Sequence, residues 1–124
     1  MPAANLTMSM EQGANFYRRL TFKTGNTPID ITGWTVRGQM RETISSTTVI
    51  ASFTTEVLDQ ITNTGEATFS LTAAQTAAIQ PLLESTGCAR KISKFVYDIE
   101  VVKPDTSVER ILQGTIEFSP EVTR

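Results

Sequence analysis

Asp98 and Glu100 are the two side chains in this sequence whose spacing suggests acid–base chemistry. Residues two apart on a strand share a face and lie about 7 Å apart, a separation that would suit the carboxyl pair of a glycoside hydrolase. Alternating charges are also typical of a strand face in water, and the remaining Asp and Glu residues are scattered along the chain. We therefore interpret the pair as a solvated strand face and predict that the protein is not an enzyme.

Cys88 is the only cysteine, and it lies near Arg90 and Lys91, two cations that favour a reactive thiolate. The chain contains no histidine, so Ser-His-Asp and Cys-His arrangements and histidine–zinc sites are excluded. The sequence also has no glycine-rich phosphate loop, no nucleophile elbow and no calcium-loop pattern. We therefore expect an incidental thiol, and no cofactor, metal or small-molecule substrate.

The composition predicts one folded domain over residues 1–124. Hydrophobic residues make up 40% and charged residues 19%, which excludes a disordered polymer. The net charge is −2 and the Lys and Arg residues form no run, so we expect no nucleic-acid partner. No apolar run approaches the roughly 20 residues that span a bilayer, and residues 1–10 lack the pattern of a signal peptide. We expect no membrane partner, and a protein that is made and used without crossing a membrane.

Alternation of apolar and polar residues at period two predicts about seven short strands. The expected strands cover residues 5–10, 16–23, 34–41, 48–55, 66–71, 95–102 and 108–118. Their apolar rows should face inward, including Leu6 in the first strand, Val108 in the last, and Trp34 as an anchor of the core. Arg18 is the misfit, because it lies on an apolar row. Either its stem packs while the guanidinium stays wet, or it forms an intersubunit ion pair.

One short helix is expected between the fifth and sixth strands. Thr72 and Gln75 match the capping box, in which a threonine hydroxyl and a glutamine three residues later satisfy the amides of a helix start. The sequence therefore predicts a helix over 72–80, which Pro81 ends. The stretch 82–93 is expected to be a polar loop. Short strands at this spacing, without βαβ alternation, predict an all-β fold, an immunoglobulin-like antiparallel β-sandwich; a closed barrel is the alternative.

Several segments carry a resemblance to a known family. They are 29–34 (IDITGW), 36–41 (VRGQMR), 65–76 (GEATFSLTAAQT), 97–101 (YDIEV) and 114–124 (GTIEFSPEVTR). Together they resemble the immunoglobulin-like virion structural proteins of tailed bacteriophages, in particular upper-baseplate amino-terminal modules and small tail-fibre-associated connector proteins. The chain departs from that pattern at 82–94, where a short glycine-centred link would be expected. The resemblance implies no catalytic residues.

The resemblance implies a structural protein of the virion, a connector or adaptor in the tail, baseplate or fibre apparatus. Its partners would be other virion proteins and copies of itself. A capsid decoration protein with the same fold is the alternative, and a module that binds host carbohydrate is a third possibility. Outer-face positions on the second and third strands and the basic loop are the expected contact residues: Tyr17, Arg19, Arg37, Arg41, Arg90 and Lys91.

Overall fold

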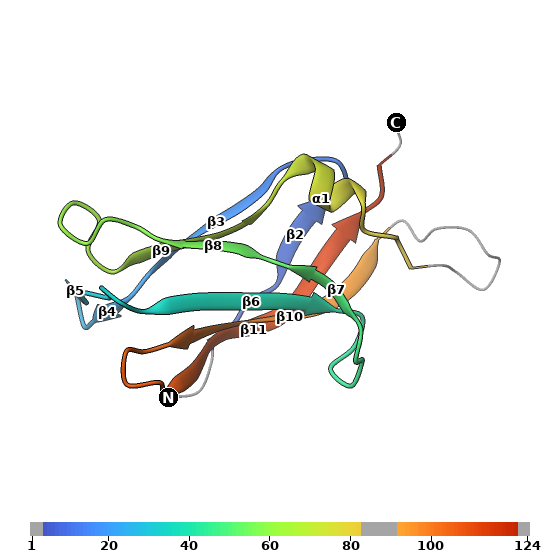
Figure 1. Cartoon of the computed structure of the whole chain (residues 1–124). Helices are drawn as coiled ribbons and strands as arrows, with labels where there is room; N and C mark the ends of the chain where they lie inside the picture. The colour runs from blue at the N-terminus through green and yellow to red at the C-terminus, as the bar shows by residue number, and fades with distance from the viewer. Residues whose placement is uncertain (1–3, 83–91, 122–124) are drawn as a thin grey trace.

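Strands make up most of the described chain and form two sheets packed face to face (Figure 1). The computed structural model describes residues 4–82 and 92–121. The strands are β1 (Ala4–Asn5), β2 (Met8–Glu11), β3 (Phe16–Thr21), β4 (Lys23–Thr24), β5 (Thr27–Pro28), β6 (Thr35–Arg41), β7 (Val49–Ser52), β8 (Thr54–Val57), β9 (Glu66–Leu71), β10 (Ser93–Val102) and β11 (Val108–Ser119). The helix α1 spans Ala73–Ala77.

The larger sheet has the strand order β1-β11-β10-β6-β7, with β2 also paired to β11, and the smaller sheet has the order β3-β9-β8. Strands β4 and β5 form a separate small hairpin. Most pairs are antiparallel, while β1 and β2 run parallel to β11. The chain is therefore an immunoglobulin-like β-sandwich, as the alternation predicts, and the two sheets do not close into the alternative barrel.

The strand predicted over 48–55 is in fact two strands in different sheets. β7 pairs with β6 in the larger sheet, whereas β8 pairs with β9 in the smaller sheet. The chain crosses at Phe53, whose N–H donates to the carbonyl of Gly38 at 2.9 Å and whose ring enters the core. The prediction of one strand was wrong because a continuous apolar row does not reveal a change of sheet.

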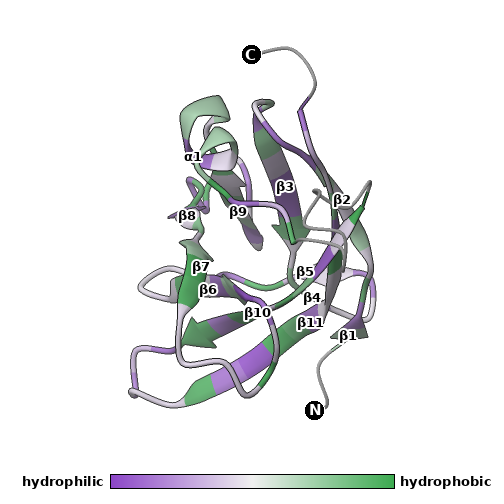
Figure 2. Cartoon of the chain, turned by 90° about the vertical axis from the view of Figure 1, so that its right-hand side faces the viewer, coloured by the Kyte–Doolittle hydropathy of each residue, from purple (hydrophilic) through white to green (hydrophobic). Residues whose placement is uncertain are grey.

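The core lies between the two sheets and is rich in aromatic and β-branched residues. The rings of Phe16, Phe53 and Phe69 pack against one another, with Phe53 and Phe69 edge to face at a centroid distance of 5.3 Å. Trp34 lies at the periphery instead of anchoring the core, and its ring packs edge to face against Phe22. Figure 2 shows the alternation of hydrophobic and hydrophilic residues along the strands of the larger sheet.

Val108 does not face the core, because β11 contains a bulge. The register with β10 shifts between the pairs Ile99–Leu112 and Glu100–Arg110, which leaves Ile111 without a partner. An extra residue in one strand reverses the side that each preceding residue faces. Val108 is consequently 50% exposed, and the prediction that its row continues inward to the start of the strand was wrong.

Leu6 is also exposed, and it lies where the first predicted strand is interrupted as it passes Gly114 of β11. β1 ends at Asn5 and β2 begins at Met8, and the N–H of Leu6 donates to the carbonyl of Gln113 at 2.9 Å. The buried hydroxyl of Tyr97 donates to the carbonyl of Leu6 at 2.6 Å. Leu6 is 48% exposed at this interruption, and its backbone carbonyl satisfies a core tyrosine.

Removing the Tyr97 hydroxyl tests this contact. Tyr97→Phe is expected to cost about 1 kcal/mol, the net value of one hydrogen bond. Burial raises the pKa of Tyr97 from 10.0 to about 12, so the folded state holds this proton where the unfolded state has lost it. Stability is therefore undiminished below pH 10 and falls as the pH rises towards 12. Urea unfolding across this range should show the fall in the wild type, and a smaller fall in the variant.

The helix α1 closes one end of the sandwich and is shorter than predicted. Both bonds of the capping box are present: the Gln75 N–H donates to the Thr72 hydroxyl, and the Thr72 N–H donates to the Gln75 side-chain oxygen. The helix ends at Ala77 instead of residue 80, and Ile79 enters the core just beyond it. The buried Thr76 hydroxyl accepts from the Gly13 N–H at 3.0 Å, which ties the helix to the turn before β3.

Candidate functional site

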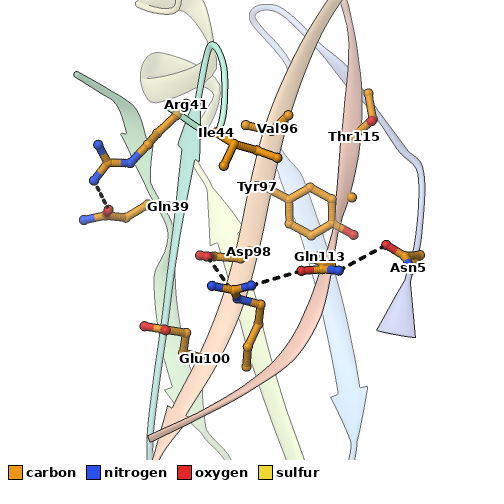
Figure 3. A pocket seen from close by; sticks show the side chains of 12 residues that line it. Asn5, Gln39, Arg41, Ile44, Val96, Tyr97, Asp98, Glu100, Gln113 and Thr115 are labelled. Carbon is orange, nitrogen blue, oxygen red and sulfur yellow. Dashed lines mark hydrogen bonds and ion pairs between the residues drawn. The ribbon is translucent and has the colours of Figure 1, made fainter. Parts of the chain in front are cut away.

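A shallow groove of about 470 Å³ lies on the outer face of the larger sheet (Figure 3). β6, β10 and β11 form its floor, β1 its side, and the loop between β6 and β7 its rim. The lining side chains are Asn5, Gln39, Arg41, Ile44, Val96, Tyr97, Asp98, Glu100, Arg110, Gln113 and Thr115, together with Gly114. Most of them are polar because this side of each strand alternates with the side that forms the core.

The two carboxylates that could have formed a catalytic pair share this outer face, but each is bound to a different arginine. The register places Glu100 directly opposite Arg37, and their side chains form an ion pair at 2.9 Å. Asp98 pairs with Arg110 at 3.5 Å. Arg110 also donates to Gln113 at 3.3 Å. The carboxylates are therefore engaged in a network of cross-strand pairs, as on a solvated strand face.

Ile44 is the least expected member of the site. Its side chain is 90% exposed and lies beside Val96 at the rim of the groove (Figure 3). A single exposed apolar side chain is common on protein surfaces, so what distinguishes Ile44 is its place at the rim of the groove. Ile44 lies in a Ser/Thr-rich loop without periodicity, so no sequence pattern predicts its role.

The predicted contact residues lie on opposite sides of the sandwich. Tyr17 and Arg19 lie on the outer face of the smaller sheet, where Arg19 forms an ion pair with Glu66 at 2.8 Å. Arg37 and Arg41 lie on the outer face of the larger sheet. The structure therefore does not join them into a single site.

Arg41 also has partners within the domain, because its guanidinium donates to the Gln39 side chain at 3.0 Å and to the Ser46 carbonyl at 2.8 Å. The second bond holds the loop that carries Ile44. Arg90, Lys91 and Cys88 lie outside the described residues, and their predicted roles stay predictions.

The described ranges contain neither a cluster of metal ligands nor a membrane-spanning helix. Within residues 4–82 and 92–121, no three Cys, Asp or Glu side chains are grouped as a metal site would require. No helix in these ranges has the length and apolar character needed to cross a bilayer.

The fold and the groove define a class, an immunoglobulin-like sandwich with a polar, internally paired outer face. CopC from Methylosinus trichosporium OB3b is similar to this chain at 10% identity, covering 94% of this chain and 89% of CopC, with a TM-score of 0.45. Murine CRIg is similar at 8% identity, covering 93% of this chain and 92% of CRIg, with a TM-score of 0.39. Scans against family models and curated proteins gave no match. Similarity this low carries no inference about function.

Proposed function

We propose that this chain is a non-enzymatic structural protein of a tailed bacteriophage virion, a connector in the tail, baseplate or fibre apparatus. The observation that carries the connector role is the outer face of the larger sheet, where a broad groove is lined by paired polar groups and bordered by Ile44. The phage setting is supported by the sequence resemblance described above. Other virion proteins and copies of this chain would be the partners.

The outer face has the chemistry of a protein interface. Arginine and exposed apolar side chains are enriched in interface cores, and charges that are already paired can be covered at less cost than isolated ones. Arg37 and Arg110 hold their carboxylate partners in the free domain. A partner that covers the groove would therefore gain apolar contact with Ile44 and Val96 while both of these ion pairs stay intact.

The carbohydrate-binding alternative is less well supported, because sugar sites commonly use an exposed aromatic ring. Tyr97 is the one aromatic residue that lines this groove, and it is 4% exposed with its hydroxyl bound to the Leu6 carbonyl. The groove therefore offers planar polar side chains but no open aromatic surface for stacking.

Incorporation into particles tests the proposal. Cells that carry the phage would express tagged chain in competition with the untagged chain, and purified particles would be analysed by quantitative mass spectrometry. Ile44→Asp is expected to reduce incorporation about tenfold or more, since a charge would replace an apolar contact at the interface. Ile61→Asp is the matched control, because Ile61 is 91% exposed in the loop between β8 and β9, away from the groove.

The expected result is that the tagged wild-type and Ile61→Asp chains enter particles in proportion to their expression, whereas the tagged Ile44→Asp chain is largely absent. Absence of the wild-type chain from purified particles would contradict the virion role. Immunogold labelling of the same particles distinguishes a location in the tail from one on the capsid. Label on the head would support the alternative, a capsid decoration protein, and contradict the tail location.

A further inference from the structure

Strand β3 forms an open edge of the smaller sheet. Its residues pair with β9 in the register Phe16–Leu71 to Thr21–Glu66. The same ladder continues to the bond from the Phe22 N–H to the Gly65 carbonyl at 2.7 Å. In an antiparallel pair, backbone groups point alternately towards and away from the neighbouring strand. The even-numbered residues of β3 therefore bond to β9, while Tyr17, Arg19 and Thr21 direct their N–H and C=O groups away from it.

The opposite side of β9 confirms this alternation. The Leu58 N–H donates to the Glu66 carbonyl at 3.0 Å. The even-numbered residues of β9 therefore form their backbone hydrogen bonds with β8, and the odd-numbered residues form theirs with β3. Within the described ranges, no strand pairs with the open side of β3. β2 lies on this side of the sandwich, but it belongs to the larger sheet and pairs with β11 (Figure 2).

Arg18 lies across this opening. Its guanidinium stacks over the Phe16 ring at 4.6 Å from the centroid, and it donates to the Tyr17 carbonyl at 2.8 Å and to the Ser9 carbonyl of β2 at 3.3 Å. These contacts match the interpretation of a packed stem with an exposed head. They also place a positive charge on one of the backbone carbonyls that the edge presents, which is a way to discourage indiscriminate strand pairing.

We propose that the edge of β3 accepts an extended, acidic strand of another protein, which adds a fourth strand to the smaller sheet. Strand addition uses the outward N–H and C=O groups for affinity and the flanking side chains for selection. The incoming strand would displace the Arg18 guanidinium from the Tyr17 carbonyl. Those side chains are basic: Arg18 and Arg19 lie on β3, and Lys23 follows it on β4. Glu66 neutralises Arg19 only, so the edge retains positive charge.

A second copy of this chain fits the same edge poorly. The odd-numbered residues of β3 face outward, so two copies can pair antiparallel about the middle of β3 only with Arg18 opposite Arg18 or with Arg19 opposite Arg19. Like charges directly opposite one another destabilise a sheet. Charge complementarity therefore favours a foreign strand whose acidic residues face the arginines. This inference rests on the proposed connector role in one respect, that the partner is a protein.

The test uses a short, fluorescently labelled peptide with capped ends in which Glu alternates with Val. A matched peptide has Lys in place of Glu, and a second has proline at alternate positions and so cannot donate to the edge. We expect the Glu peptide to bind about tenfold more tightly than the Lys peptide, because its Glu side chains all lie on one face of the sheet, where one or two attractive charge pairs would become repulsive with Lys. Amide exchange at Tyr17, Arg19 and Thr21 should slow on binding, and the proline peptide should not bind.

Two variants localise the effect. Arg19→Pro removes an outward N–H but no bond to β9, so it should abolish peptide binding while the fold persists. Arg18→Glu/Arg19→Glu keeps every backbone donor and should reverse the preference, so that the Lys peptide binds better. If Arg19→Pro does not fold, the Arg18→Glu/Arg19→Glu variant still tests the proposal, because it keeps every backbone donor.

Equal binding of the Glu and Lys peptides, no binding at about 1 mM peptide, or slowed exchange confined to other strands would overturn the proposal. A dimer in sedimentation that Arg19→Pro dissolves would overturn the choice of a foreign strand. Ile44→Asp should leave peptide binding unchanged. Failure of this edge can therefore be distinguished from failure of the docking face on the larger sheet.

Discussion

Phe69→Ala is expected to lower the free energy of unfolding by about 4 kcal/mol, a large part of the stability of a domain of this size. Phe69 is fully buried in the centre of β9, and its ring contacts those of Phe16 and Phe53. These three rings come from β3, β9 and the point where the chain crosses between sheets. Removal of the central ring therefore leaves a cavity at the contact between the two sheets, which rigid backbone on both sides cannot close.

Urea unfolding followed by circular dichroism measures this effect. Tyr17→Ala is the matched control, because Tyr17 is on the adjacent strand but is 55% exposed, and it should change stability by less than about 0.5 kcal/mol. A loss below about 1.5 kcal/mol for Phe69→Ala would contradict the packing of these three rings, since it would mean that the site collapses or that the ring is not enclosed.

Gly114→Ala is expected to cost about 3 kcal/mol and to release the amino-terminal strands from β11. Gly114 has a φ of 153°, a conformation that residues with a side chain rarely adopt. A Cβ placed there would overlap the carbonyl oxygen of Leu6 and lie 3.0 Å from its carbonyl carbon. These are backbone atoms, so they cannot move aside as a flexible side chain would.

The measurement is amide exchange together with urea unfolding. Exchange should accelerate in β1 and β2 of the variant, and the Tyr97 hydroxyl should lose its acceptor. Gly25→Ala is the control, because Gly25 has a positive φ of 61° but no atom lies within 4 Å of the position that its Cβ would occupy, so strain alone should cost about 1 kcal/mol. Equal costs at both positions would show that the close approach of Leu6 does not matter.

Much of the fold could be predicted because the rows that face the core have a strong period of two. β9 and β10 match their predicted strands to within two residues, and Phe95, Tyr97 and Ile99 are buried as expected. The predictions fail where the backbone is irregular. The bulge at Ile111 changes the face and the crossing at Phe53 changes the sheet, and neither is marked by a turn signal in the sequence; the interruption at Leu6 leaves an apolar side chain exposed.

The candidate site could be predicted only in part. Period two places Arg37 on an outer face, and it places Asp98 and Glu100 together on another. Both sets of residues lie on the same face of the larger sheet because β6 pairs with β10. This pairing joins residues about sixty positions apart, so the sequence pattern does not reveal it. Ile44 could not be found in the sequence because its loop has no period, and its importance comes from the groove below it.

The same limit applies to the open edge of β3. Alternation identifies Arg18 as a misfit, but the direction of each backbone carbonyl depends on which residues bond to β9. The contact between Arg18 and the Ser9 carbonyl joins two different sheets. A sequence pattern describes side chains, whereas strand addition depends on the backbone groups left over after the sheets have formed.

The most direct test of the connector role is a reconstruction of the phage particle by electron cryomicroscopy at a resolution that shows side chains. We expect density for this chain in the tail, baseplate or fibre apparatus, with the outer face of the larger sheet against a neighbouring protein and Ile44 covered by it. A particle without this chain, or one in which that face is open to solvent while other surfaces hold the chain in place, would contradict the account.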